Sequence, residues 1–253
     1  CMIDLSKVKA QILKQFGSQA GNTRGKEAIV LVSSGSFAPV HLMHTRMFEI
    51  AKSAAEKRGL IVVGGFMSPS GDDYVRGKLG PGNWITLQQR VDMARLACSD
   101  SDWVSVVDWG ISRGSEVTRL INEHLMQEFP EYVGNNYRRP LLHALEIHGA
   151  DTLLRFRAWQ QSKRYIGLGR AGYTQALIEG IRTAGSNNII LAEEELPDIS
   201  STKVREAVKS GSDLNQMLCP PVADYMRRVI VPWWQQYNNS SSTSKKVKKV
   251  MVN

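Results

Sequence analysis

Cysteine is scarce in this 253-residue chain, which contains only Cys1, Cys98 and Cys219. Three widely spaced cysteines without a C-x-x-C pair exclude a disulfide framework and indicate a reducing compartment. No apolar run approaches the roughly 20 residues that a membrane helix needs. The first residues also lack the apolar core of a secretory signal. We therefore expect a cytoplasmic protein with no membrane partner.

Acidic residues are fewer than basic ones, 24 against 32, so the formal net charge is +8. Four of the lysines lie in the last ten residues, and without them the rest of the chain carries +4. This modest remainder suits a phosphorylated small molecule, and we expect no nucleic-acid partner. The terminal run KKVKK is similar to a basic nuclear-import signal, although a solvated tail has the same composition.

Short apolar runs alternate with segments of helical periodicity along the chain. The apolar runs predict strands at residues 28–34, 60–68, 103–109, 141–147, 165–169 and 188–193. Repeated strand–helix order predicts an α/β fold: a single Rossmann-like domain with a doubly wound, mainly parallel sheet and helices on both faces. We divide the chain into an N-terminal helical extension (1–26), this domain (27–237) and a Ser/Lys-rich disordered tail (238–253).

Three local predictions accompany this fold. The Gly/Pro-rich stretch 68–83 is expected to be a loop. Thr86 and Gln89 have the spacing of a capping box and predict a helix that runs to about Cys98. A further helix is expected from Ser115 to Phe129.

The first chemical motif is SSGSFAPVHLMH, residues 33–44, between the first strand and a helix expected to begin near Pro39 or Val40. Small residues there allow close backbone approach, and a helix N-terminus offers free N–H groups to an anion. His41 and His44, three residues apart, would project from the first turn and donate hydrogen bonds to a phosphate. An ordinary βα turn and a zinc-binding pair are the alternatives, although no third zinc ligand has suitable spacing.

The second motif is DISSTKVREAV, residues 198–208, in which hydroxyl side chains precede a helix with Lys203 and Arg205 in its first turn. Basic residues at a helix N-terminus oppose the helix dipole, and a bound anion would relieve that conflict. The alternative is a solvated helix with a serine N-cap.

Together the two motifs resemble the nucleotidyltransferase superfamily. GSFAPVHLMH and DISSTKVR are similar to the eukaryotic nicotinamide/nicotinate mononucleotide adenylyltransferases, and weaker similarity continues at residues 68–74, 103–109, 147–156 and 169–172. The resemblance implies transfer of AMP from ATP to nicotinamide mononucleotide or nicotinate mononucleotide in NAD biosynthesis, with Mg²⁺ and direct in-line attack. Mg²⁺ would be held mainly by phosphates and water, with Asp151 as the protein candidate.

The resemblance also implies roles for individual residues. His44, His41 and Arg205 would be catalytic. Residues that would bind ATP and its phosphates are Gly35, Ser36, Phe37, Ser200, Ser201, Thr202, Lys203 and Arg205. Residues that would bind the pyridine mononucleotide are Arg76, Lys78, Trp109, Trp159, Gly149, Asp151 and Arg170, with the tryptophan rings packing on the pyridine. Core positions for the tryptophans, a capping role for Asp151 and solvated positions for Arg76 and Lys78 are the alternatives.

Some features depart from this family or suggest other functions. Ala38 replaces the usual Asn or Asp, and Gly110 follows Trp109 where relatives often have Glu, which leaves amide against acid selectivity open. We assign structural roles to the other three histidines, His124, His143 and His148. A G-x-G-x-x-G pattern at 167–172 comes too late in the chain for a hydride-transfer site. Phosphopantetheine or a flavin nucleotide as acceptor, a nucleotide-binding scaffold or chaperone, and a homo-oligomer remain open.

Overall fold

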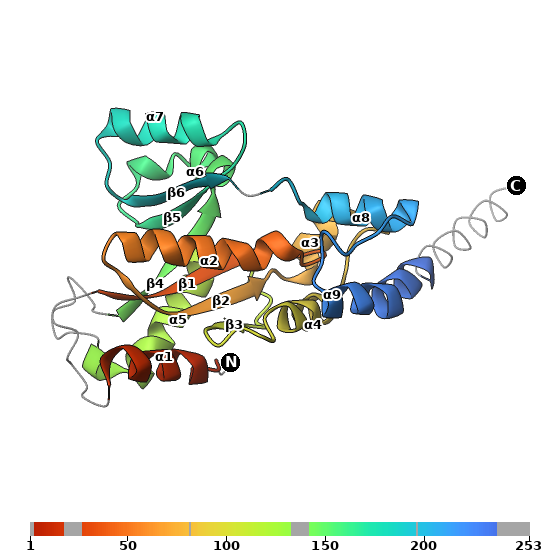
Figure 1. The fold of residues 1–253 in the computed structure, drawn as a ribbon, viewed down its shortest axis with the longest axis horizontal. Helices are drawn as coiled ribbons and strands as arrows, with labels where there is room; N and C mark the ends of the chain where they lie inside the picture. Colours follow the sequence, from red (N-terminus) through yellow and green to blue (C-terminus); the bar gives the residue numbers. More distant parts are fainter. Residues whose placement is uncertain (1–2, 18–26, 81, 133–141, 196, 237–253) are drawn as a thin grey trace, which may run out of the picture.

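The structure is a computed structural model that describes residues 3–17, 27–80, 82–132, 142–195 and 197–236 (Figure 1). The predicted tail, and with it the KKVKK run, lies outside the described residues. Residues 18–26, which follow the first helix, and residues 133–141 also lie outside the described residues. The three-part division of the chain therefore remains a prediction.

Six parallel strands form one sheet in the order β3-β2-β1-β4-β5-β6. Their bounds are β1 Ala28–Gly35, β2 Ile61–Pro69, β3 Val104–Val106, β4 Leu142–Gly149, β5 Tyr165–Gly169 and β6 Ile189–Glu195. The strand order reverses between β1 and β4, which makes the carboxyl ends of these two strands the switch point where ligands of such sheets bind. The predicted doubly wound parallel sheet is confirmed.

Helices cover both faces of the sheet (Figure 1). The longer helices are α1 Ser6–Phe16, α2 Leu42–Lys57, α3 Asp72–Leu79, α4 Leu87–Ala97, α5 Gly114–Glu128, α7 Thr174–Ala184 and α8 Ser201–Ser210. Shorter ones are α6 Ala150–Arg155, α9 Pro220–Tyr225, η1 Pro130–Tyr132 and η2 Ala158–Gln160, and one π-helical turn, η3, covers Met226–Ile230. Thr86 caps α4, as its capping box predicts, and accepts a hydrogen bond from Gln89 N.

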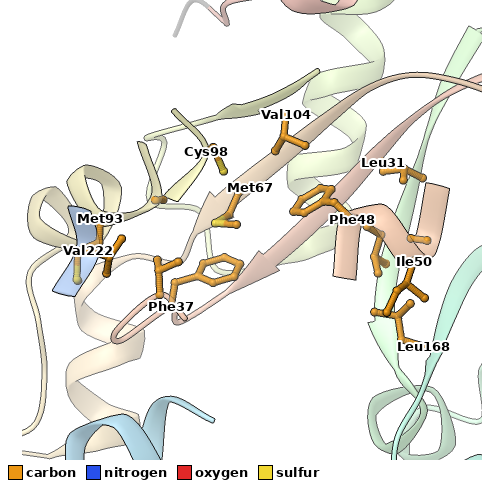
Figure 2. Packing of buried hydrophobic residues seen from close by; sticks show 14 of the residues in the cluster. Leu31, Phe37, Phe48, Ile50, Met67, Met93, Cys98, Val104, Leu168 and Val222 are labelled. Atoms are coloured by element: carbon orange, nitrogen blue, oxygen red, sulfur yellow. The ribbon is translucent and has the colours of Figure 1, made fainter. Parts of the chain in front are cut away.

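Alternate residues of β1 enter two different cores because successive strand side chains point to opposite faces. Ile29 and Leu31 join the larger cluster with α2, α4 and the C-terminal helices. Val30 and Val32 join a second cluster with α1 and α5. A third cluster lies under α6 and α7. Figure 2 draws part of the larger cluster, which includes Phe37 from the loop after β1.

Three local predictions differ from the structure. The stretch 68–83 is not all loop, because residues 72–79 form α3, with two aspartates in its first turn and Val75 buried. Both aspartates suit the helix dipole. The third strand is confined to Val104–Val106, since it pairs with only three residues of β2. Helix α2 begins at Leu42 rather than near Pro39 because residues 37–41 form a separate loop whose last residue, His41, is the N-cap.

Candidate active site

The candidate site lies where the pairing between β1 and β4 ends. Register pairs between the two strands stop at Val32 and Glu146, yet β1 continues to Gly35 and β4 to Gly149. The strands therefore separate at the switch point, and the first predicted motif follows directly from β1. A ligand that entered here would meet this loop, the start of α6 and the ends of β4 and β5.

The loop after β1 is held by residues from α3 and α4. Arg90 of α4 donates a hydrogen bond to Ser36 O at 3.1 Å, and Lys78 of α3 donates to Ser36 Oγ at 3.3 Å. Phe37 has a positive φ of 46° and only 4% exposure. Its ring packs edge-on against His44, with the ring centroids 4.7 Å apart. The loop is thus shaped by core packing as well as by its small residues.

His41 and His44 lie together at the start of α2. Their rings stack with centroids 3.6 Å apart. His41 is the N-cap of α2, and His44 is the third residue of its first turn. Burial lowers the pKa of His41 to about 4. Burial, and then the neighbouring His41, hold the pKa of His44 well below its ordinary value. Both imidazoles are therefore neutral near pH 7.

The hydrogen bond within this pair determines the tautomer of His44. The backbone N–H of His41 donates to Nδ1 of His44 at 3.1 Å. Because a backbone N–H can only donate, Nδ1 must accept, and the proton of the neutral ring is on Nε2. His44 is thus a neutral N–H donor, which can bind a phosphoryl oxygen without giving up a proton.

The second predicted motif contacts the first through long-range hydrogen bonds. Arg205 of α8 donates to Ala38 O at 2.7 Å, and Ser201 Oγ donates to Pro39 O at 2.8 Å. Arg205 also donates to Thr202 Oγ1 at 3.0 Å. Burial lowers the pKa of the half-buried Arg205, but its ordinary value is so high that the guanidinium remains charged.

The remaining polar groups of α8 are closer to solvent. Ser200 is the N-cap and accepts a hydrogen bond from Lys203 N. The ammonium of Lys203 forms an ion pair with Asp198, and the hydrogen bond from Lys203 lowers the pKa of that exposed carboxyl. Lys203 therefore has an acidic partner that an incoming anion would have to displace.

Arg90 is a residue that the sequence analysis did not identify. It is completely buried, donates to Ile85 O at 2.9 Å and forms an ion pair with Asp72 at 2.9 Å. Burial lowers the pKa of Arg90, while the hydrogen bond and charge of Asp72 oppose that effect. The sequence feature that could have identified Arg90 is its place among the apolar residues of an amphipathic helix, next to Val91. Arg90 positions the loop after β1 through its hydrogen bond to Ser36 O.

Three of the predicted acceptor residues meet at the ends of β4 and β5. Gly149 is the N-cap of α6, and Asp151 lies in its first turn. The Oδ2 atom of Asp151 is 2.9 Å from Nη1 of Arg170, which follows β5. The side chain of Asp151 remains 31% exposed. A single partly exposed carboxylate fits Mg²⁺ that is carried mainly by phosphates and water.

The two predicted tryptophans contact different helices. Trp109 stacks on His124 of α5, with ring centroids 5.8 Å apart. Trp159 packs against α7. A Cβ added at Gly180 would lie 3.0 Å from the Trp159 ring, so this close contact depends on glycine. Arg76 lies over the ring of Trp84 at 4.4 Å, and Lys78 donates a hydrogen bond to Ser36 in the first loop.

Two further observations concern metal-binding clusters and membrane-spanning helices. The described part of the chain holds no cluster of three or more His, Cys, Asp or Glu residues that could bind a metal ion. No helix within those ranges has the length and apolar character required to span a bilayer.

A parallel doubly wound sheet with a loop of small residues at its switch point is the architecture of nucleotide-binding α/β domains. A model of the cytidylyltransferase-like family matches residues 32–207. The chain therefore belongs to the cytidylyltransferase-like family. The match spans the first loop, the end of β4 and most of α8.

Individual relatives agree with this assignment. The chain is 28% identical, over 83% of its own length and 92% of the relative, to a nicotinamide/nicotinic acid mononucleotide adenylyltransferase of Arabidopsis thaliana. A Bos taurus enzyme of that name is also 28% identical, over 80% of this chain and 88% of its own. The fold is similar to Plasmodium falciparum nicotinic acid mononucleotide adenylyltransferase complexed with NaAD, with a TM-score of 0.53, 12% identity and coverage of 80% and 96%. The resemblance that the motifs predicted is confirmed.

Proposed function

We propose that this chain transfers AMP from ATP to nicotinamide mononucleotide or nicotinate mononucleotide and releases pyrophosphate. The observation that supports this most directly is the connection between the two motifs, in which Arg205 and Ser201 of α8 bond to the carbonyls of Ala38 and Pro39. This connection gathers a neutral N–H donor, a guanidinium and several hydroxyls around one loop. Such a set suits a triphosphate, and the names of the relatives indicate the acceptor.

The reaction requires no acid or base from the protein. A phosphate oxygen of the mononucleotide forms a bond to the α-phosphorus of ATP, and the bond from that phosphorus to the β-phosphate bridging oxygen breaks. Pyrophosphate leaves with the electron pair, and no proton is transferred. Catalysis then consists of positioning and charge stabilisation. In this role, His44 Nε2–H donates to an oxygen of the reacting phosphate, and Arg205 stabilises charge on the leaving pyrophosphate.

Mg²⁺ is part of this proposal. It would neutralise triphosphate charge, and the partly exposed Asp151 is the carboxylate that would contact it. Gly149 and Arg170 would contact the mononucleotide nearby. The roles of Trp109, Trp159, Arg76 and Lys78 in acceptor binding remain predictions.

Release of pyrophosphate from Mg²⁺-ATP with four acceptors tests the proposal. The acceptors are the two pyridine mononucleotides, with phosphopantetheine and flavin mononucleotide as controls. We expect release only with a pyridine mononucleotide, accompanied by the matching dinucleotide. Release only with a control acceptor would assign another substrate, and ATP binding without release from any acceptor would favour a scaffold.

Location and assembly are also proposals. We propose a cytoplasmic protein that enters the nucleus if the lysine run near the C-terminus acts as an import signal, and a homo-oligomer is compatible with the sequence. Imaging of the full chain with and without residues 245–249 tests the first, and light scattering tests the second.

A further inference from the structure

The sheet has two outer strands, β3 and β6, and the backbone groups along their outer edges differ in what covers them. The backbone N–H of Gly65 in β2 donates to Trp103 O at 2.9 Å, so the next residue, Val104, directs its N–H and C=O away from β2. That carbonyl of Val104 accepts a hydrogen bond from Lys7 Nζ of α1 at 2.6 Å. Because β3 is short and its edge carries this lysine, a further strand cannot pair with it.

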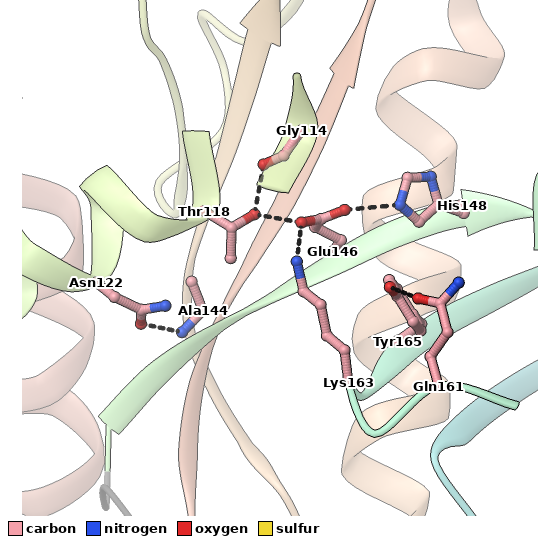
Figure 3. Close-up of polar contacts among 9 residues, drawn as sticks. All are labelled: Gly114, Thr118, Asn122, Ala144, Glu146, His148, Gln161, Lys163 and Tyr165. Carbon is pink, nitrogen blue, oxygen red and sulfur yellow. Dashed lines mark hydrogen bonds and ion pairs between the residues drawn. The ribbon is translucent and has the colours of Figure 1, made fainter. Parts of the chain in front are cut away.

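Side chains also bond to polar groups of the interior strand β4 (Figure 3). Register pairs between β4 and β5 begin at Glu146, and Ala144 N, nearer the start of β4, donates to Asn122 Oδ1 of α5 at 2.8 Å. The carboxylate of Glu146 accepts hydrogen bonds from three side chains: Thr118 Oγ1 at 2.9 Å, His148 Nε2 at 2.8 Å and Lys163 Nζ. At β3 and β4, polar groups that no neighbouring strand reaches are thus bonded by side chains of the same domain.

The outer edge of β6 has no such cover among the described residues. Figure 1 shows β6 as the outermost strand at this end of the sheet, with α7 on one face and α2 on the other. Tyr165 N of β5 donates to Asn188 O at 2.9 Å. Because successive strand residues direct their backbone groups to alternate sides, Ile190 also bonds toward β5, while Ile189 and Leu191 direct their N–H and C=O outward. An uncovered edge of this kind can pair with another chain.

A groove of about 240 Å³ lies between this edge strand and α2. Its apolar lining includes Ile50 and Ala54 of α2 and Leu191 of β6. Its charged residues are Lys57 and Arg58 at the C-terminal end of α2, and Glu194 near the end of β6. A strand that paired with the outward backbone groups of Leu191 would therefore also cover an apolar groove with charged ends.

The two ends of this edge differ in charge. Arg46 of α2 pairs with Glu194 at 3.1 Å, which places the first part of α2 beside the carboxyl end of β6. Lys57 lies eleven residues after Arg46, about 16 Å further along the helix at 1.5 Å per residue, so Lys57 and Arg58 lie toward the amino end of β6. Both are exposed, and within the described ranges neither forms an ion pair. At the carboxyl end, the exposed Glu194 and Glu195 outnumber Arg46.

We propose that β6 pairs in the antiparallel direction with β6 of a second copy of this chain, about a twofold axis at Leu191. On this axis the two Leu191 residues lie opposite each other and exchange N–H···O=C bonds. The basic end of each copy, Lys57 and Arg58, then lies against the acidic end of the other copy, Glu194 and Glu195, whereas parallel pairing would place like charges together. This inference names the surface of the proposed homo-oligomer and is independent of the proposed reaction.

Sedimentation velocity of the full chain tests this pairing. We expect wild type to pass from monomer to dimer between about 1 and about 100 μM, because a single strand edge with its groove is the size of a transient interface. The double variant Lys57→Glu/Arg58→Glu should raise the Kd of the dimer by about tenfold, because the twofold axis repeats each lost ion pair. Circular dichroism shows whether each variant folds.

Two further variants and one control locate the contact. Adding Glu194→Lys to the double variant exchanges the charges of the two ends and should return the Kd to within about threefold of wild type. Leu191→Pro removes an outward N–H but no bond to β5, so it should abolish the dimer while the chain stays folded. The control, Lys52→Glu, reverses a charge of α2 that lies over the ring of Trp103, outside the groove, and should dimerise as wild type does.

Three results would overturn the proposal: wild type that stays monomeric up to about 100 μM, an unchanged Kd in the double variant, or an equal rise in Lys52→Glu, which would assign association to net charge. Should Leu191→Pro not fold, the charge exchange with Glu194→Lys decides. Pyrophosphate release from the same samples tests the reaction separately. A dimer without turnover would contradict only the proposed function, and a monomer with turnover would contradict only the pairing of β6.

Discussion

Around the loop after β1, polar side chains bond to backbone carbonyls of distant segments, whereas at the ends of β4 and β5 they pair with each other near solvent. Arg205 and Arg90 each hold a carbonyl of the loop. Asp151 and Arg170 form an ion pair whose side chains are 31% and 58% exposed. The loop is therefore preorganised. The ends of β4 and β5, where we propose that the acceptor binds and which we call the acceptor end, can exchange partners when a ligand binds.

This difference has a mechanistic reason. The transferring phosphate develops charge only briefly, so its donors must be in position beforehand. The acceptor only has to be bound and oriented, and an exposed ion pair can exchange partners at little cost. Changes around the loop should therefore alter kcat, and changes at the acceptor end should alter KM.

The largest expected effect is that of His44→Ala. Loss of the neutral Nε2–H donor should lower kcat by about 10²–10³-fold, the usual cost of removing one transition-state donor, with little change in KM for ATP. Steady-state pyrophosphate release measures both. His143→Ala is the control outside the site. Turnover within about twofold of wild type would contradict the assigned role, because a contact made in the transition state must affect rate.

Arg90→Met should destabilise the domain and loosen the loop. It leaves Asp72 and two backbone carbonyls without their donor, which should lower the free energy of unfolding by about 3 kcal/mol. Urea denaturation measures the loss. Asp72→Asn removes the charge of the partner but retains Arg90 and should cost less. Equal losses in the two variants would mean that the ion pair, and not the carbonyl contacts, supports the loop.

Arg205→Ala should affect both ATP binding and rate. The variant loses a guanidinium and the bond to Ala38 O, so we expect KM for ATP to rise and kcat to fall, each by about tenfold. Arg182→Ala, which removes an exposed arginine of α7, controls for net charge. An unchanged KM for ATP would exclude a triphosphate contact.

The smallest expected effect is at the acceptor end. Asp151→Asn weakens the ion pair with Arg170 and should raise KM for the mononucleotide by only about threefold, since exposed pairs contribute little. Measurement at several Mg²⁺ concentrations also tests metal binding, because a lost ligand would raise the Mg²⁺ requirement. A large fall in kcat with KM unchanged would show that the acceptor end is as preorganised as the loop.

Much of the fold could be predicted because its signals are local. Short apolar runs marked all six strands, and the capping box at Thr86 marked the start of α4. The stretch 68–83 was predicted to be a loop because its glycines and two prolines concealed the eight-residue helix α3. The third strand was overestimated because Trp103 and Val107 are apolar for core packing and not for strand pairing.

The candidate site likewise contains residues that could be predicted from the sequence and residues that could not. The two phosphate motifs could be found because small residues, hydroxyls and cations at helix starts are visible locally, and their order along the chain suggested that they act together. Arg90 was missed because its role depends on burial. Trp109 and Trp159 were predicted to pack on the pyridine ring, and that stays a prediction. Their contacts with His124 of α5 and Gly180 of α7 could not be predicted because they depend on packing.

The sequence by itself determined the parallel sheet, its order of strands and helices, and the two segments that carry phosphate chemistry, because periodicity and residue type act over a few neighbouring residues. The tertiary structure decided which carbonyls Arg205, Ser201 and Arg90 hold. It also decided that Glu146, a charged residue within an apolar strand, would face Thr118, Lys163 and His148. Contacts of this kind join residues far apart in the chain, so they exist only once the sheet and its helices have packed together.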